Sequence, residues 1–288
     1  MPVEVKKRFV AMILTHKRAG NVKTLEVLRD HGYTGEVRLV VDDEDPMLEE
    51  YRNLYGDMVW EFSKAKLEGK FDACDNFGNR CSITYPRNAA FDLAEENGVD
   101  YFIELDDDYR AFTWNFDSSL NYSVRPVGCL DKVFEAMVKF LENTPTTSIA
   151  TAQSGDFMGG DMGQFARSVW AKRKAMNSFI CSTKKRFEFR GKINEDVNAY
   201  VGDGNLGALF FTINLVCLYQ GATQQTEGGL TELYLDVGTY VKSFYTVMIA
   251  PSCVKVALMG AGHKRLHHKV DWKYAVPKIL PESLKKSS

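Results

Sequence analysis

Three adjacent aspartates, Asp106, Asp107 and Asp108, end an apolar run at residues 101–105. Neighbouring carboxylates repel one another unless a cation or solvent neutralises their charge. Because alternate residues of a strand share a face, Asp106 and Asp108 can turn together toward one hard metal ion, with Asp107 directed away. An acidic turn at a strand end would have the same composition. We favour a Mg²⁺ or Mn²⁺ site, because an apolar strand leading directly into acids suits the carboxyl edge of a parallel sheet.

Two further groups are candidates for the same edge. Asp42 and Asp43 follow the apolar run 37–41, where a carboxylate can accept hydrogen bonds from a nucleobase or a ribose. Arg87 and Asn88 stand at the start of a predicted helix and offer a cation and an amide to a diphosphate or a base. A solvated turn and an ordinary surface helix start explain these two groups equally well.

Later acids and histidines could complete such a site. Glu195 and Asp196 follow a basic stretch, and one of them could remove a proton from an acceptor hydroxyl. The alternative is a helix start enriched in acids that suit the macrodipole. Three of the five histidines cluster at residues 263–268, and one could complete a metal shell or contact phosphate. Adjacent strand residues face opposite ways, so we expect that role for only one of His267 and His268.

Two polar segments are candidates for acceptor binding. One places Lys184, Lys185, Arg186 and Arg190 around the aromatic residues 187 and 189, a composition typical of a contact with a single strand or a flipped base. A solvated strand with a buried aromatic face explains it about as well. The other, 220–231, is rich in amides, hydroxyls and glycines that could bind sugar hydroxyls or a base edge, or form only a loop. Its candidate residues are Gln224, Gln225 and Glu227.

The elements that must position these residues alternate between strand and helix, which indicates an α/β fold with a mixed, mostly parallel central sheet. A hairpin is predicted at 111–124, because aromatic and polar residues alternate there. Region 51–83 has no clear pattern beyond a strand near 58–60. The other predicted strands are 8–14, 37–41, 101–106 and 148–153, and 209–218 is a strongly apolar element. The predicted helices are 21–31, 86–97, 130–142, a helix or turn at 195–200, and one within 230–248.

Size and charge limit the classes of protein. With 288 residues, 45% of them hydrophobic, we expect one domain over 1–276 and a polar, basic tail over 277–288. The net charge of −2 gives no global attraction to nucleic acid or anionic membranes, so any nucleic-acid contact must be local. Six dispersed cysteines predict free, largely buried thiols in a reducing compartment. Without an apolar signal core or a membrane span, the sequence predicts a cytoplasmic protein.

Taken together, these segments resemble the TET/JBP-associated glycosyltransferases, a family with members in tailed bacteriophages. The resemblance extends over nearly the whole chain, and its most specific segments are 192–200, 223–232, 238–245, 251–255 and 265–268. It implies a GT-A fold, a UDP-sugar donor, a divalent metal ion (Mn²⁺ or Mg²⁺), and, as in phage members, a hydroxylated pyrimidine in DNA as the acceptor.

The resemblance also assigns roles to positions already singled out: metal or diphosphate contacts to Asp106 and Asp108, an acceptor-side role to Glu195 or Asp196, and a metal-side role to His268 or His267. It stays open which two aspartates of the triplet form the metal pair. We count Asp107 among the residues expected to contact the nucleotide-sugar. The expected reaction is sugar transfer from UDP to 5-hydroxymethyl- or 5-hydroxycytosine in DNA. A protein or small-molecule acceptor, or an inactive DNA-binding module, is the alternative.

Overall fold

The computed structural model describes residues 7–74, 80–157, 159–163, 165–220, 239–259, 265–275 and 282. The N-terminal part alternates strands and helices. Its strands pair in parallel in the spatial order β3-β2-β1-β4. They are β1 (Phe9–Leu14), β2 (Glu36–Asp42), β3 (Val59–Phe62) and β4 (Tyr101–Asp106), and the helices between them are α1 (Lys23–Asp30), α2 (Leu48–Tyr55), α3 (Lys64–Leu67) and α4 (Thr84–Glu96).

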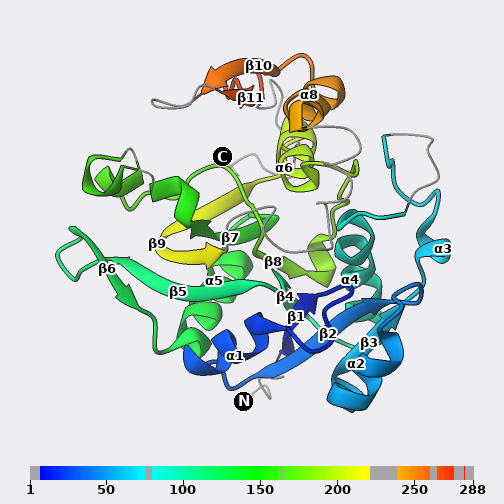
Figure 1. The fold of residues 1–288 in the computed structure, drawn as a ribbon. Helices are drawn as coiled ribbons and strands as arrows, with labels where there is room; N and C mark the ends of the chain where they lie inside the picture. The colour runs from blue at the N-terminus through cyan, green and yellow to red at the C-terminus, as the bar shows by residue number, and fades with distance from the viewer. Residues whose placement is uncertain are drawn as a thin grey trace.

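Later strands extend this sheet to nine within the described residues, in the order β3-β2-β1-β4-β8-β7-β9-β5-β6 (Figure 1). They are β5 (Tyr109–Phe116), β6 (Tyr122–Pro126), β7 (Ser148–Gln153), β8 (Phe179–Ser182) and β9 (Phe210–Gln220). The short β8 runs antiparallel to both β4 and β7, while β9 is parallel to β7 and antiparallel to β5. The predicted mixed α/β sheet is confirmed. Its parallel pairs dominate only the N-terminal part.

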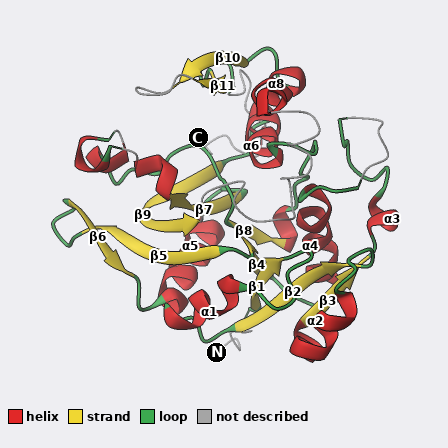
Figure 2. Cartoon of the chain, in the orientation of Figure 1, coloured by secondary structure: helices red, strands yellow, loops and turns green. Residues whose placement is uncertain are grey.

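Helices cover both faces of the sheet (Figure 2). On one face, α4 and α6 (Glu195–Asn205) pack on a cluster that includes Val10 and Met12 of β1. On the other, α1, α2 and α5 (Leu130–Asn143) pack on a cluster that includes Ala11 and Ile13. Because β1 is covered on both sides, its sequence is a continuous apolar run without polar alternation.

The C-terminal part adds α8 (Thr239–Ile249) and a two-stranded antiparallel sheet of β10 (Val254–Met259) and β11 (Arg265–Val270). Ser243 of α8 donates a hydrogen bond to the carbonyl of Leu266 at 2.8 Å, which fixes this hairpin to the helix. Among the described helices, none is long and apolar enough to cross a membrane.

Most predicted elements are confirmed, with shifts of a few residues at their ends. The 111–124 hairpin is the antiparallel pair β5–β6, and the predicted helix 130–142 is α5, which buries Val133, Met137 and Leu141. Phe140 of the same helix is 37% exposed. The thiols of all six cysteines are free, and three are buried. The candidates Gln224, Gln225 and Glu227 lie outside the described residues.

Candidate active site

The order of the strands reverses between β1 and β4. β2 and β3 lie on one side of β1 and β4 lies on the other, so the loops that follow β1 and β4 leave in different directions. Such a reversal of strand order is where open α/β sheets bind ligands. Two hydrogen bonds tie these loops together. Thr15 Oγ1 donates to Asp107 Oδ2 at 2.7 Å, and Arg18 Nη1 donates to Asp107 Oδ1.

The three aspartates take three different surroundings. Asp107 is buried and turned toward Thr15 and Arg18, so it joins the two loops. Asp106 points to the α4 side and keeps 21% of its side chain exposed, and Asp108 keeps 31%. Asp108 Oδ1 accepts a long hydrogen bond from Gln220 Nε2 at 3.4 Å. The two outer carboxylates are therefore the ones that solvent, or a ligand, can reach.

Arg87 is the centre of the site. Its guanidinium donates from Nε to Glu195 Oε1 at 3.0 Å, from Nη1 to Glu104 Oε2 at 3.2 Å, and from Nη2 to Asp106 Oδ1 at 3.2 Å. The rings of Phe179 and Phe189 lie 5.2 and 5.5 Å from the guanidinium carbon. Only 1% of the Arg87 side chain is exposed. The expectation that it meets a diphosphate is corrected, because carboxylates and rings enclose it.

Asn88 also has partners within the protein. Its Nδ2 donates to the carbonyl of Phe189 at 2.9 Å, and its Oδ1 accepts from the amide of Phe189 at 3.0 Å. The side chain is 5% exposed. Its predicted contact with a base or a diphosphate is therefore corrected. Asn88 fixes the segment that leads from β8 to α6, in the way a neighbouring strand would.

The carboxylates around Arg87 outnumber the cation. Burial, opposed by Arg87, raises the pKa of Glu104 to about 8, and burial also raises the pKa of Asp106 to about 7, with a further contribution from Asp108. Glu104 Oε1 is buried without a hydrogen-bond partner among the described residues. Burial opposes the charge of Arg87, but the surrounding carboxylates outweigh it and raise the pKa of Arg87. This end of β4 has an excess of acids that a further cation would stabilise.

Asp106 and Asp108 fit a divalent metal ion by their chemistry. Both offer hard oxygen donors and both are reachable from solvent, as measured by their 21% and 31% exposure. Mg²⁺ is commonly held by one or two carboxylates together with substrate phosphates and water, so a third protein ligand is not required. Asp106 and Asp108 are partly exposed, and the nearby buried acids Glu104 and Glu195 share only the charge of Arg87. This excess of negative charge suits such a cation.

The predicted acceptor-side acids begin α6. Glu195 faces Arg87, while Asp196 Oδ1 accepts from the backbone amide of Val197 at 2.7 Å. Burial, together with the adjacent Glu195, raises the pKa of Asp196 to about 6. Both acids also lie in the first turn of the helix, where its dipole favours negative charge. The structure thus brings Glu195 next to Asp106 through Arg87, although 89 positions separate the two acids.

The acids after β2 have their own partners. Asp42 is buried and accepts from His16 Nδ1 at 2.7 Å and from Lys64 Nζ at 2.8 Å. Burial opposes its ionisation, but these hydrogen bonds and the charge of Lys64 outweigh it and lower the pKa of Asp42. Asp43 is exposed and accepts from the backbone amide of Lys64. His16, Asp42 and Asp45 hold ligand atoms within 4.8 Å of one another, and the pairing of the histidine with both acids accounts for that closeness.

The late histidines are not part of this arrangement. His268 pairs with Val256 in the β10–β11 hairpin, which lies beyond α8 and α6 from the end of β4 (Figure 1). Burial lowers the pKa of His268 to about 4, and its Nδ1 has no hydrogen-bond partner among the described residues. This structure does not bring His268 to the aspartates. The hairpin is held on α8 instead, so the predicted metal role is not met here.

The basic segment after β8 lies at the opposite edge of the sheet. The amide of Thr183 donates to the carbonyl of Asp100, just before β4 begins, and six residues of strand correspond to about 20 Å between Asp100 and Asp106. Lys185 Nζ donates to the carbonyls of Leu141, Thr144 and Thr146 at the end of α5. Lys184 and Lys185 thus lie away from the aspartates, and their contact with DNA stays a prediction.

The rest of that segment has structural partners too. Arg190 pairs with Glu188 and Asp203, Arg186 pairs with Asp92 and Glu95, and the two interleaved phenylalanines are buried in the core. A pocket of about 820 Å³ adjoins these residues. Because the aromatic rings are inside, the segment lacks the stacking surface that was predicted for a nucleic-acid contact.

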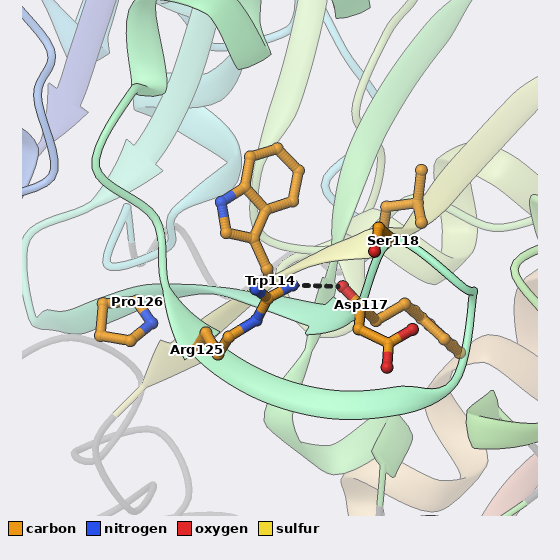
Figure 3. A pocket seen from close by; sticks show the side chains of 7 residues that line it. Trp114, Asp117, Ser118, Arg125 and Pro126 are labelled. Atoms are coloured by element: carbon orange, nitrogen blue, oxygen red, sulfur yellow. Dashed lines mark hydrogen bonds between the residues drawn. The ribbon is translucent and has the colours of Figure 1, made fainter.

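A second pocket, of about 530 Å³, lies at the β5–β6 hairpin (Figure 3). Trp114, Asp117, Ser118, Arg125 and Pro126 line it, and Arg125 Nη2 donates to the carbonyl of Phe116 at 3.3 Å. It lies at the far end of β5 from Asp108, so it is separate from the carboxylates around Arg87.

Sequence reasoning missed several residues of the site, mainly Thr15, His16 and Arg18 in the loop after β1, and Glu104 within β4. A signal existed for the loop, because it follows a predicted strand of the α/β sheet, and loops after such strands line the carboxyl edge. For Glu104 the signal was a charged residue inside an apolar strand, two positions before Asp106 and therefore on the same face.

The sequence matches the family TET-Associated Glycosyltransferase over residues 9–229. The chain belongs to this family and is a glycosyltransferase. No curated protein matches the sequence.

Solved structures of glycosyltransferases are distantly similar. GalNAc-T7, solved with UDP, GalNAc and Mn²⁺, shares 11% identity at a TM-score of 0.46, over 76% of this chain and 44% of that one. Glucosyl-3-phosphoglycerate synthase from Mycobacterium tuberculosis, solved with Mg²⁺ and UDP, shares 8% at 0.47, over 93% and 92%. The mannosyltransferase PcManGT from Pyrobaculum calidifontis, solved with GDP-Man and Mn²⁺, shares 12% at 0.47, over 84% and 64%. This chain thus spans less than half of the GalNAc-T7 structure.

Proposed function

We propose that this glycosyltransferase uses a divalent metal ion and a UDP-sugar, and that it transfers the sugar to the hydroxyl of 5-hydroxymethyl- or 5-hydroxycytosine in DNA. One observation carries the proposal of catalysis. A single buried guanidinium, that of Arg87, binds both Asp106 and Glu195. It thereby fixes the carboxylate expected on the donor side relative to the acids expected on the acceptor side.

On the donor side, Asp106 and Asp108 would hold the metal ion. When bound, the ion supplies charge that stabilises the leaving diphosphate. Asp107 holds the loop after β1 against this edge through Thr15 and Arg18. The exposed carboxylate of Asp43 stands at the same edge, after β2, and is our candidate for a contact with the nucleoside.

On the acceptor side, we assign proton abstraction to Asp196 and positioning to Glu195. Glu195 is held by Arg87, whereas the pKa of Asp196, raised to about 6, leaves it ionised at neutral pH yet basic enough to accept a proton. A base works best when its pKa lies near the operating pH, which favours Asp196 of the two acids.

The DNA acceptor rests on the family. Members of this family in bacteriophages are expected to modify hydroxylated pyrimidines, and the carboxylates expected to act in transfer are present in this chain. A protein or small-molecule acceptor is the second candidate. An inactive DNA-binding module is the third, and the intact carboxylate set around Arg87 argues against it.

The test is incubation of hydroxymethylated DNA with the protein, Mn²⁺ and a panel of UDP-sugars, followed by mass spectrometry of the nucleosides. We expect a glycosylated cytidine from one donor. Unmodified DNA and the Asp108→Asn variant are the controls and should give none. Absence of any glycosylated nucleoside, with donor hydrolysis intact, would move the protein or small-molecule acceptor to first place.

A further inference from the structure

We propose that the acceptor strand is held by the loop between β7 and β8, residues 154–178, through the described residues Arg167, Trp170 and Lys172. The partner is a single-stranded or locally unpaired nucleic acid, whose phosphates meet the two cations and one of whose bases stacks on the indole. The identity of the partner rests on the proposed function.

The position of the loop follows from strand direction. β4 and β7 both run antiparallel to β8, so their carboxyl ends lie at the same edge of the sheet. The loop therefore leaves β7 at the edge where Asp106 and Asp108 stand. By contrast, the segment after β8 begins at the opposite edge, next to Asp100.

Hydrogen bonds connect the end of the loop to the triplet. Tyr109, the residue after Asp108, donates from its hydroxyl to the carbonyl of Asn177 at 2.6 Å. Asn177 Nδ2 donates to Gln220 Oε1 at 2.8 Å, and Gln220 Nε2 lies 3.4 Å from Asp108 Oδ1. These bonds place the end of the loop, at Asn177, beside Asp108, whereas Trp170 and Lys172 are fixed farther back along β9, at Asn214 and Thr212. A strand bound to the loop would thus extend from the reacting groups along β9.

The charge of the loop suits a polyanion. Residues 154–178 contain four cations, Arg167, Lys172, Arg173 and Lys174, and two acids, Asp156 and Asp161, a net charge of +2 from 4 − 2. Lys174 pairs with Asp156. Arg167 and Lys172 make no ion pair with any described residue, and Arg167 is exposed. In the segment after β8, both described arginines pair with two acids each.

The loop also presents an aromatic ring. Trp170 is 79% exposed and Met162 is 72% exposed, large values for side chains that normally avoid water. The backbone beneath the indole is fixed, because Asn214 Nδ2 of β9 donates to the carbonyls of Ser168 and Trp170, both at 3.1 Å. The next cation is fixed as well, since the backbone of Lys172 exchanges two hydrogen bonds with Thr212.

An exposed indole on a fixed backbone, flanked by cations that form no ion pair with a described residue, is an arrangement by which proteins bind single strands. Arg167 Nη2 donates to the carbonyl of Met162 at 3.3 Å, and Lys172 Nζ lies 5.4 Å from the ring centre of Phe165, so neither charge is neutralised. A base inside a duplex has no face free for such stacking. The whole-chain charge of −2 provides no general attraction to a polyanion, so the strand depends on local positive charge such as that of the loop.

The experiment measures fluorescence anisotropy of a labelled single-stranded oligonucleotide containing 5-hydroxymethylcytosine, over a range of salt concentrations, with the full-length protein. For Arg167→Ala/Lys172→Ala we expect weaker binding and a salt slope reduced by about 1.4, from about 0.7 per lost phosphate contact. Trp170→Ala should weaken binding roughly 5- to 150-fold, and Trp170→Phe should restore much of it. The control Lys66→Ala/Lys132→Ala removes two exposed cations from α3 and α5 and should bind as the wild type does.

Binding of the UDP-sugar, measured by calorimetry, reports whether each variant keeps its donor site. Wild-type affinity and salt slope in both the double variant and Trp170→Ala would overturn the proposal, as would a wild-type protein that binds no DNA or binds duplex as tightly as single strand. Strand binding through the loop without sugar transfer would contradict the proposed function and leave this inference in place.

Discussion

At the scale of single residues, the site depends on one cation shared among acids. Arg87 offers a rigid fork of donors, and three carboxylates use it. Removing one partner of a buried ion pair leaves uncompensated charge, which costs about 3–5 kcal/mol. The arginine is therefore a positioning residue whose loss disturbs both sides of the reaction.

We expect Arg87→Gln to lower the free energy of unfolding by about 3–5 kcal/mol in urea titrations. Arg87→Lys keeps the charge but lacks the fork, so it should fold and yet lose turnover and Mn²⁺ affinity. Arg8→Lys is the matched control, because Arg8 also pairs through its fork, with Glu36, but away from the acids of the site. Wild-type turnover and Mn²⁺ affinity in Arg87→Lys would show that the fork is dispensable.

The pH dependence of turnover should report Asp196. With a pKa of about 6, it is ionised above pH 6 and protonated below it, so turnover should fall as the pH drops through about 6. Asp196→Asn should lose roughly 10²–10⁴-fold in turnover with little change in donor affinity. Glu188→Gln, a change at an acid paired with Arg190, should leave the profile unchanged. If Asp196→Asn keeps both its turnover and the acid limb, Asp196 is not the base, and the limb reports another acid such as Asp106.

At the scale of elements, strands were easier to predict than the contacts between them. The apolar run before Asp106 identified β4 and its edge, because buried parallel strands show continuous apolar sequence. The partners of Asp106 could not be read in the same way. Arg87 and Glu195 are 108 positions apart, and nothing local in the sequence reveals that they meet. The position of the basic segment after β8 could not be predicted for a related reason. The sequence shows its composition but not the edge of the sheet from which it leaves.

The prediction at this scale concerns the end of α5. Lys185 donates to the carbonyls of Leu141, in the last turn of the helix, and of Thr144 and Thr146, just after it. The last carbonyls of a helix have no partner within it. We expect Lys185→Ala to lower the free energy of unfolding by about 1–3 kcal/mol, because charged hydrogen bonds are lost. DNA affinity should remain at the wild-type value. Urea titration measures the free energy of unfolding, and anisotropy measures the DNA affinity. Lys184→Ala, which removes the exposed neighbouring lysine, should leave the free energy of unfolding unchanged. A loss of DNA affinity without a loss of stability would restore this segment as an acceptor surface.

At the scale of the whole molecule, the acids around Arg87 are a cost to stability that a ligand can relieve. Anything that binds only the native state stabilises it, by about 2.7 kcal/mol at a ligand concentration of 100 Kd. We therefore expect Mn²⁺ with UDP to raise the Tm by several degrees. Asp108→Asn should abolish the shift, and Glu135→Gln, which alters an exposed acid on α5, should keep it. An unchanged Tm in the wild type, at concentrations that saturate turnover, would contradict a metal site at the triplet.

Arg87 also has a consequence for how this family can vary. Its single positive charge serves Glu104, Asp106 and Glu195 together, so none of the four residues can be exchanged without altering the balance for the others. Substitutions there should be strongly non-additive, as expected for residues in one network. Among relatives, we expect a neutral residue at the position of Arg87 only where Glu104 or Glu195 has become neutral too. Such paired changes would leave a record of this contact in sequences alone.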